Sequence, residues 1–402
     1  MNREIQLIKN KERLGSILFE TGLVLELLIM MTDAASWTLP YRGRLTQAAF
    51  GLFVLKILMT RYNARQLILG GVAGLIGVAS YLTCREEYVI RAVIFVIAAI
   101  GIDIGLTLKI VFYGVLASTI VIMGMSLTGV GGEIKDVRDY GRDGVIETRY
   151  CLGFSHANNV HSIIWYLAAV VILRLRDKLK FLYLFIMAAV SIVMYFFTLS
   201  RTGLAVSLLV LVLSAAVRMG DYAADRRKRD KGDTGVIKSA SGVPAVPGIE
   251  DILLIIMTLL TLVVSLFLTV RAAYEFPYLN DTMEKLDRLL TGRIEMVWEH
   301  APLYAWRLFP GGQVAELVDD GFAVIGYSYG YVVLGLLTAA IVYLSVRFLK
   351  QRDRYGQIIL VSVIMMIFME STFIFNVSLL CNMLLIICMS CKTQQTEQKR
   401  AA

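Results

Sequence analysis

Two arginines stand beside glycine in short polar segments next to apolar stretches. Arg201 lies in Ser200-Arg201-Thr202-Gly203, the only link between two strongly apolar segments, and Arg293 follows Gly292. A charge so close to hydrocarbon is costly unless it faces a bundle interior or an aqueous cavity. A guanidinium offers a planar fork of donors that grips phosphate oxygens and stays charged at physiological pH. Both are therefore candidate phosphate ligands, and the alternative is that they are surface charges that anchor helices to headgroups.

Histidines supply the candidate acid–base groups. His156 lies where a polar run that begins at Arg149 enters an apolar stretch, next to Asn158. An imidazole there can act as a general base near neutral pH or donate a hydrogen bond to phosphate. His300 is a second candidate, whereas His161, one turn further on, fits packing better. A purely structural role at a helix start is the alternative for His156.

Acidic side chains complete the candidate set. Asp319 and Asp320 precede an apolar stretch, where carboxylates also suit a helix N-terminus. Glu370 and Asn376 form a polar pair near the end of the last two apolar segments, and this pair could simply join neighbouring helices. Motifs for nucleotide hydrolysis, zinc proteolysis and calcium binding are absent from the sequence. We expect neither a metal site nor a cofactor.

The elements that must position these residues are membrane helices. Of the 402 residues 57% are hydrophobic and 18% charged, against about 25% charge in a typical globular domain. Hydrocarbon offers no partners to backbone groups, so each span must be a helix of about 20 residues. We predict one all-α, polytopic membrane domain over residues 1–402 with twelve spans: 14–33, 44–60, 66–83, 88–102, 108–128, 157–175, 180–198, 202–218, 250–271, 321–346, 357–371 and 374–391.

Charge predicts the orientation. An even number of spans puts both termini on one side, and most of the 40 basic residues fall on that side, which predicts cytoplasmic termini. The net charge of +8 then reflects orientation and contact with anionic lipid, so we expect no nucleic-acid partner. The first apolar segment lacks a small-residue cleavage site and is typical of a retained anchor. Cysteine spacing suggests no disulfide framework.

Three water-exposed segments are long enough to carry chemistry. The segment 219–249 is predicted to be a flexible cytoplasmic connection, because its charge block and Gly/Pro/Ser-rich part cannot bury a core. The segments 129–156 and 272–320 are predicted to lie outside, and the second contains amphipathic helical patterning. The candidate residues lie in or next to these two outer loops or at the outer ends of spans. An enzymatic function should therefore reside on the outer face.

The order of these features resembles the O-antigen polymerase and ligase superfamily, specifically the Wzy-type polymerases of capsule and exopolysaccharide clusters. The likeness extends from about residue 45 to 390. Each matching segment is weak alone, but their order and shared sidedness make the combination fairly specific. The segments are Arg149-Tyr150-Cys151-Leu152-Gly153-Phe154-Ser155-His156-Ala157-Asn158, Ser200-Arg201-Thr202-Gly203, Thr291-Gly292-Arg293 with Trp298, and Asp319-Asp320-Gly321-Phe322.

The resemblance implies a GT-C-like architecture and an inverting, metal-independent glycosyl transfer at the outer face of the bacterial plasma membrane. Similar proteins move a growing glycan from undecaprenyl pyrophosphate onto a lipid-linked repeat unit. By this likeness Arg201 and Arg293 hold the donor pyrophosphate, and His156 orients or deprotonates the acceptor hydroxyl. The substrate pocket would also include Arg149, Asn158, His300, Asp319 and Asp320. Its partners would be lipid-linked glycans, the bilayer, and a chain-length regulator and flippase of the same pathway.

Two departures from the family pattern favour a polymerase over a ligase. Asp319 and Asp320 stand where many relatives have Asp-Asn, and the second outer loop is short beside those of Gram-negative ligases. A ligase that transfers glycan to another acceptor remains the close alternative. A flippase or other transporter predicts charges deep in several spans, for which Glu26, Lys56 and Asp103 are the candidates. A membrane scaffold should tolerate loss of any single outer arginine.

Overall fold

The structure, a computed structural model, confirms an all-α polytopic membrane protein. It describes residues 2–35, 37, 39–139, 146–230, 248–274, 281–290, 292–302, 306–309 and 318–371. Within these residues eight helices are long and apolar enough to cross a membrane, and two shorter apolar helices accompany them. The predicted number of twelve spans and the orientation of the termini stay predictions.

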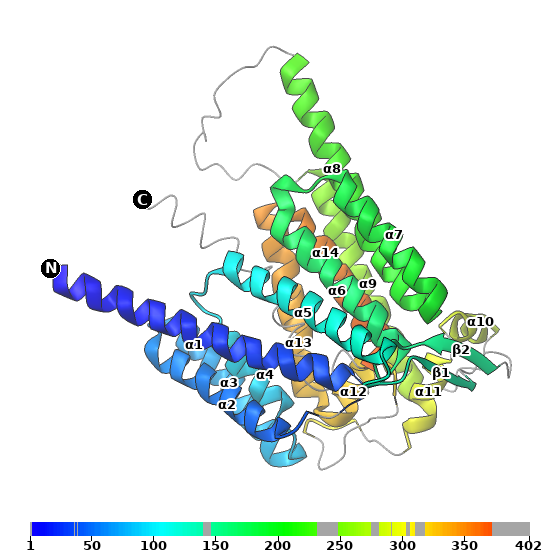
Figure 1. Ribbon diagram of the computed structural model, residues 1–402, viewed down its shortest axis with the longest axis horizontal. Helices are drawn as coiled ribbons and strands as arrows, with labels where there is room; N and C mark the ends of the chain where they lie inside the picture. Colours follow the sequence, from blue (N-terminus) through cyan, green and yellow to red (C-terminus); the bar gives the residue numbers. More distant parts are fainter. Residues whose placement is uncertain are drawn as a thin grey trace.

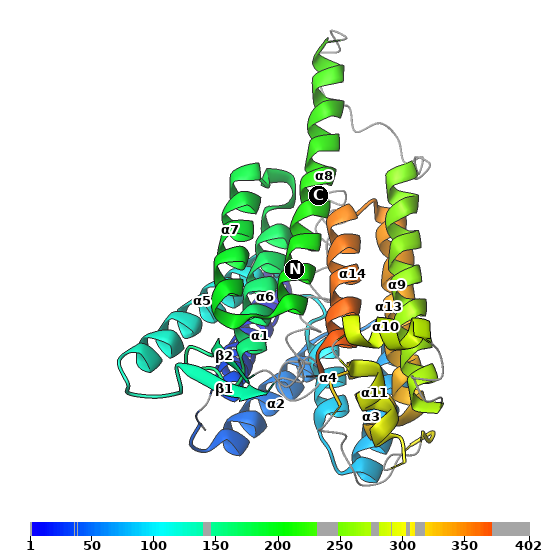
Figure 2. The ribbon, with the colours of Figure 1, turned by 90° about the vertical axis from the view of Figure 1, so that its right-hand side faces the viewer.

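The helices run back and forth along one bundle (Figures 1 and 2). In chain order the described elements are α1 (Asn2–Ala34), α2 (Arg42–Met59), α3 (Ala64–Cys84), α4 (Tyr88–Ala98), α5 (Ile104–Leu127), β1 (Lys135–Asp139), β2 (Ile146–Tyr150), α6 (Ala157–Leu175), η1 (Arg176–Lys178), α7 (Phe181–Thr198), α8 (Arg201–Asp230), α9 (Ile249–Tyr274), α10 (Asp281–Leu289), α11 (Arg293–His300), α12 (Gly321–Ser328), α13 (Gly330–Gln351) and α14 (Arg354–Met369).

Polar side chains begin many of these helices. Asn63 and Gln66 form a capping box at α3, while Asp103 caps α5 and Asp353 caps α14. His156 caps α6 in the same way. Such caps satisfy the first N–H groups of a helix, which is worth about 1 kcal/mol in water. Each cap therefore fixes where a helix begins and which residues stand at its end.

The helix α6 lies at the centre of the bundle. Of its most apolar stretch 61% is buried, against 17% for the corresponding stretches of α3 and α7. It packs against α5, α7, α8 and α14, whereas α3 and α7 expose leucine, valine and phenylalanine along much of their length. Such exposure is natural in lipid, because acyl chains are as apolar as these side chains. Residues at the start of α6 thus hold a central position.

Hydropathy predicted the bounds of the central helix α6 better than the bounds of several other helices. The predicted span 157–175 coincides with α6, and 180–198 differs from α7 by one residue. The predicted span 321–346 is instead two helices, because Gly330, the first residue of α13, adopts the left-handed conformation (φ 85°). The predicted span 374–391 lies outside the described residues.

The segment predicted to be a flexible cytoplasmic connection is partly helical. The helix α8 continues to Asp230, so the interpretation of 219–230 as a flexible loop was wrong. Charged residues with good helix propensity can extend a helix into water beyond the bilayer. Residues 231–247 lie outside the described part of the chain.

The two predicted outer loops meet at one end of the bundle, which we call the loop end. The strands β1 and β2 form an antiparallel hairpin there, and α10 and α11 lie at the same end (Figures 1 and 2). The hairpin joins the end of α1, since Ser155 N donates to Ala34 O at 2.9 Å and Ala35 pairs with Phe154. The loop end therefore gathers the segments that carry the candidate residues.

Candidate functional site

Arg293 is a buried, firmly held guanidinium. It is the first residue of α11, after Gly292 in the left-handed conformation (φ 78°), and is 6% exposed. Its Nε donates to Met369 O at 2.7 Å and its Nη1 to Leu290 O at 2.9 Å. Its Nη2 reaches Glu370 Oε1 at a longer 3.3 Å. Main-chain carbonyls thus fix the orientation of this charge.

Glu370 connects Arg293 to the central helix. The same oxygen, Oε1, accepts a hydrogen bond from Asn158 Nδ2 at 3.0 Å, and Glu370 is 5% exposed. The starts of α6 and α11 and the end of α14 therefore converge on one carboxylate. We call Asn158, Arg293 and Glu370 the central cluster. The sequence paired Glu370 with Asn376, which lies outside the described residues; the partners seen here are Asn158 and Arg293.

Asp320 is a second buried acid at the loop end. It is 2% exposed and caps α12, with Oδ1 accepting from Phe322 N at 2.8 Å and Ala323 N at 3.2 Å. Its Oδ2 lies 2.5 Å from the Thr269 hydroxyl on α9. The capping alternative considered for this position is therefore realised, and the cap joins α12 to α9.

A proton count at Thr269 indicates that Asp320 can be neutral. The Thr269 hydroxyl, which has one proton, contacts both Asp320 Oδ2 and Ser265 O, the latter at 2.9 Å. If the hydroxyl donates to Ser265 O, the carboxyl group must supply the other proton. Burial raises the pKa of Asp320 to about 7, against the lowering effects of its hydrogen bonds and of nearby Arg293. Near neutral pH the group can exist in both forms.

Arg201, the other candidate phosphate ligand, is exposed, whereas Arg293 is buried. It is the first residue of α8, and its side chain has no ion pair or hydrogen bond with the described residues. The turn that carries it packs on α6, because a Cβ at Gly203 would lie 2.7 Å from the His161 ring. His161 Nδ1 also contacts Thr198 Oγ1 at 3.3 Å. Since His161 is one turn after Asn158, α6 positions both Arg201 and the central cluster.

His156 serves as a helix cap. Its Nδ1 accepts a hydrogen bond from Asn158 N at 3.2 Å, which places the proton of the neutral ring on Nε2. In this state the ring can donate a hydrogen bond from Nε2 but cannot accept a proton there. The geometry therefore favours orientation over deprotonation among the two roles that the sequence left open.

The remaining predicted residues are bound locally. Arg149 is 4% exposed, and its Nη2 lies 2.8 Å from Oε2 of Glu147, which is two residues earlier on the same strand β2. His300 Nδ1 contacts Met296 O at 2.8 Å within α11. Asp319 is half-buried and its N–H donates to Met296 Sδ at 3.4 Å. The contact between Asp319 and Met296 joins α11 to the residues before α12, and none of these three contacts involves the central cluster.

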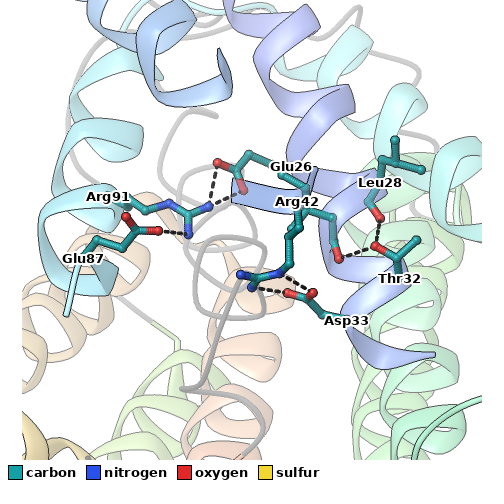
Figure 3. Close-up of polar contacts among 8 residues, drawn as sticks. Glu26, Leu28, Thr32, Asp33, Arg42, Glu87 and Arg91 are labelled. Atoms are coloured by element: carbon teal, nitrogen blue, oxygen red, sulfur yellow. Dashed lines mark hydrogen bonds and ion pairs between the residues drawn. The ribbon is translucent and has the colours of Figure 1, made fainter. Parts of the chain in front are cut away.

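A second set of charges lies among α1, α2 and α4, and sequence reasoning did not predict its pairings. Glu26 and Arg91 are buried, whereas the Glu87 side chain is 50% exposed. Arg91 Nη2 meets both oxygens of Glu26 at 3.0 and 2.9 Å, and its Nη1 reaches Glu87 at 3.2 Å (Figure 3). Arg42 binds both oxygens of Asp33 at 2.6 Å. We call these five residues the N-terminal ion-pair cluster. Glu26 and Arg91 are 65 residues apart, so spacing gave no signal for that pair, whereas Glu87 and Arg91 are only four residues apart.

The deep charges that a transporter would need have local partners. Glu26 pairs with Arg91, and the Lys56 ammonium donates to Ile100 O. Asp103 caps α5 by accepting from Leu106 N at 3.2 Å. Each of these groups is accounted for by helix packing or capping.

Within the described part of the chain no group of three or more His, Cys, Asp and Glu residues could hold a metal ion. Cys84 and Cys151 are both buried, and no disulfide joins them. The candidate residues offer two guanidinium groups, those of Arg201 and Arg293, and two buried acidic side chains, those of Glu370 and Asp320. Such a set suits binding of a phosphate ester and stabilisation of charge on it.

Comparisons with known proteins add no family assignment. No family model matches this chain, and no curated protein or solved structure matches it. The family resemblance therefore rests on the four segments quoted from the sequence.

Proposed function

We propose that this chain is a polysaccharide polymerase. It would transfer a growing glycan from undecaprenyl pyrophosphate onto a lipid-linked repeat unit at the outer face of the bacterial plasma membrane. The observation that carries the proposal is the convergence on α6: Asn158 from the first segment bonds Glu370, which pairs with Arg293 from the third. The turn of the second segment packs on the same helix through Gly203 and His161.

The two arginines have different roles toward the pyrophosphate leaving group. Arg201, which is exposed at the start of α8, meets the pyrophosphate as it arrives. Arg293 is held by main-chain carbonyls, so it needs little reorganisation when negative charge grows on the departing phosphate. Glu370 keeps Arg293 in place while the site is empty.

The transfer itself breaks one bond and forms one. The acceptor hydroxyl oxygen attacks the anomeric carbon, the bond from that carbon to the pyrophosphate oxygen breaks, and its electron pair stays on the pyrophosphate. The hydroxyl proton passes to a base or to water. By the family resemblance His156 orients the acceptor, and its Nδ1 is engaged in the cap of α6, which fixes the ring at the start of that helix.

The test is polymerisation by the purified protein in lipid vesicles given a short undecaprenyl-pyrophosphate glycan. A gel should resolve longer chains with the wild type and with Arg44→Ala, a control at an exposed arginine at the start of α2. Arg201→Ala and Arg293→Ala should yield none.

Three other outcomes would overturn the proposal. Transfer of intact glycan to an acceptor other than a repeat unit would make the protein a ligase. Passage of substrate across the bilayer at unchanged length would make it a flippase. Activity that survives in both arginine variants would leave the motif residues without a catalytic role.

A further inference from the structure

We propose that a groove between α9 and α13 holds the polyprenyl chain of the lipid-linked substrate, an inference that rests on the proposed function. The groove has a volume of about 680 Å³ and an apolar lining. We call it the α9–α13 groove, and Figure 2 shows the two helices side by side. Residues that define it are Leu266, Val270, Trp306, Tyr331, Gly335 and Tyr343.

The groove runs lengthwise along a membrane-facing surface. Tyr331, Gly335 and Tyr343 lie on one face of α13, and twelve residues of helix correspond to about 18 Å. Both α9 and α13 are long apolar helices of the kind that cross a membrane. Since both helices are apolar, a groove between them faces hydrocarbon rather than water, and a hydrocarbon chain matches its apolar lining.

Aromatic side chains mark the end of the groove nearest the loop end. Tyr331 OH lies 2.9 Å from Tyr274 OH. The Trp306 ring packs against those of Tyr331 and Tyr327, with centroids 5.2 and 5.4 Å apart. Tyrosine and tryptophan concentrate at the depth of lipid headgroups. The groove therefore opens where the polar part of a lipid would sit.

This end of the groove adjoins the proposed site. Val270 in the groove follows Thr269, whose hydroxyl contacts Asp320. Tyr327 OH, behind Trp306, donates to Val297 O on α11, the helix that begins with Arg293. A chain in the groove would thus place its headgroup beside the arginine and acid of the site, which favours the substrate over a bulk phospholipid as occupant.

The groove would orient the lipid-linked substrate rather than increase its binding affinity. Lipid tails are as apolar as the groove lining, so moving a chain from the bilayer into the groove gains little hydrophobic free energy. Holding the chain does fix the direction of the pyrophosphate relative to the reacting groups, and misplacement of about 1 Å can cost 100-fold in rate. We therefore expect the groove to affect kcat/KM and preference for chain length.

Gly335 provides a clean way to fill the groove. A Cβ at this exposed glycine would have no neighbour within 4 Å, so Gly335→Leu adds bulk without a clash. Gly71 on α3 is also exposed with no neighbour within 4 Å, and Gly71→Leu is the matched control. Both changes should favour helix formation slightly.

Two measurements test the inference separately from the proposed function. The first compares kcat/KM for glycan donors built on undecaprenyl and on farnesyl pyrophosphate. Wild type and Gly71→Leu should prefer the long chain about tenfold, and Gly335→Leu should lose that preference. An unchanged preference in Gly335→Leu, with polymerisation intact, would overturn the groove and leave the function standing.

The second measurement needs no catalysis. A polyprenyl phosphate with a diazirine in its chain is photolysed with the protein in phosphatidylethanolamine and phosphatidylglycerol vesicles, and labelled peptides are identified. We expect label on α13 that is displaced by undecaprenyl phosphate but not by phosphatidic acid. Gly335→Leu should reduce this label. That result would support the inference even if no polymer forms. Equal displacement by phosphatidic acid would assign the groove to bulk lipid. No label on α13, as when another segment such as 374–391 covers it, would also overturn the inference.

Discussion

Two buried arginine–carboxylate pairs of this protein differ in what holds the guanidinium. In the N-terminal ion-pair cluster, Arg91 directs its nitrogens at the carboxylates of Glu26 and Glu87. In the central cluster, Arg293 uses two nitrogens on main-chain carbonyls and meets Glu370 only at 3.3 Å. The first pair closes on itself within packed helices. The second is fixed by the backbone at helix ends, as a preorganised binding group should be.

Burial and pairing alone therefore do not mark a functional arginine. Arg91 and Arg293 are similarly buried, at 4% and 6% exposed. They differ in location, since Arg293 lies among the segments of the loop end and Arg91 lies within α4. If the contrast is real, replacing each pair by apolar residues must have opposite consequences for activity.

The largest expected effect comes from swapping each pair for methionine. Removing only Arg91 should destabilise the protein by about 3–5 kcal/mol, because Glu26 would stay buried without a partner, and the double change Arg91→Met with Glu26→Met should restore stability. Arg293→Met with Glu370→Met should likewise remain folded but lose polymerisation at least 100-fold. Thermal unfolding in detergent and initial polymerisation rates measure the two effects. An inactive, stable Arg91/Glu26 double variant would erase the distinction between the clusters.

A smaller effect is expected from Asn158→Ala. This change removes one hydrogen bond to a charged group, worth about 1.5–3 kcal/mol, and lets Glu370 shift relative to α6. Activity should fall about tenfold with the fold retained. Asn63→Ala is the matched control, since it also removes one hydrogen bond of an asparagine side chain but does so at the cap of α3, outside the central cluster. Equal losses in both variants would argue that the central cluster has no special role.

The smallest effect concerns pH. The pKa of Asp320 is raised in the folded protein to about 7 from an ordinary value near 3.8, so its contribution to stability is fully present below about pH 4 and is lost as pH rises through 7. Between pH 6 and 8 the free energy of unfolding should fall by about 1 kcal/mol. Asp320→Asn, which resembles the protonated acid, should flatten this slope in thermal unfolding. A wild-type slope of opposite sign would show that the carboxylate form is the native one.

The sequence predicted the positions of most helices but few of the side-chain contacts between them. A continuous apolar run with a polar start predicted α6 to the residue, and basic or acidic flanks predicted most other helices within a few positions. Hydropathy shows where an apolar segment ends, but a helix can continue beyond that point. It therefore did not predict that α8 continues to Asp230. It also gave no reason to break the helix at Gly330, where only the backbone conformation matters.

The pairings of the site depend on long-range packing. Glu370 and Asn158 are 212 residues apart, and Glu26 and Arg91 are 65 apart. The sequence identified Glu370 as a costly polar residue but assigned it a near neighbour, because only local spacing was visible. His156 shows the converse, since its capping role follows from its place at a helix start, where local geometry decides.

In the proposed function, Arg201 and Arg293 hold the pyrophosphate. The direct measurement is the affinity of the purified protein for undecaprenyl pyrophosphate, compared among wild type, Arg201→Ala, Arg293→Lys and Arg44→Ala. Charged hydrogen bonds are worth about 1.5–3 kcal/mol, so the first two variants should each bind about 10- to 100-fold more weakly, while Arg44→Ala should bind like wild type. Unchanged affinity in both Arg201→Ala and Arg293→Lys would contradict the account.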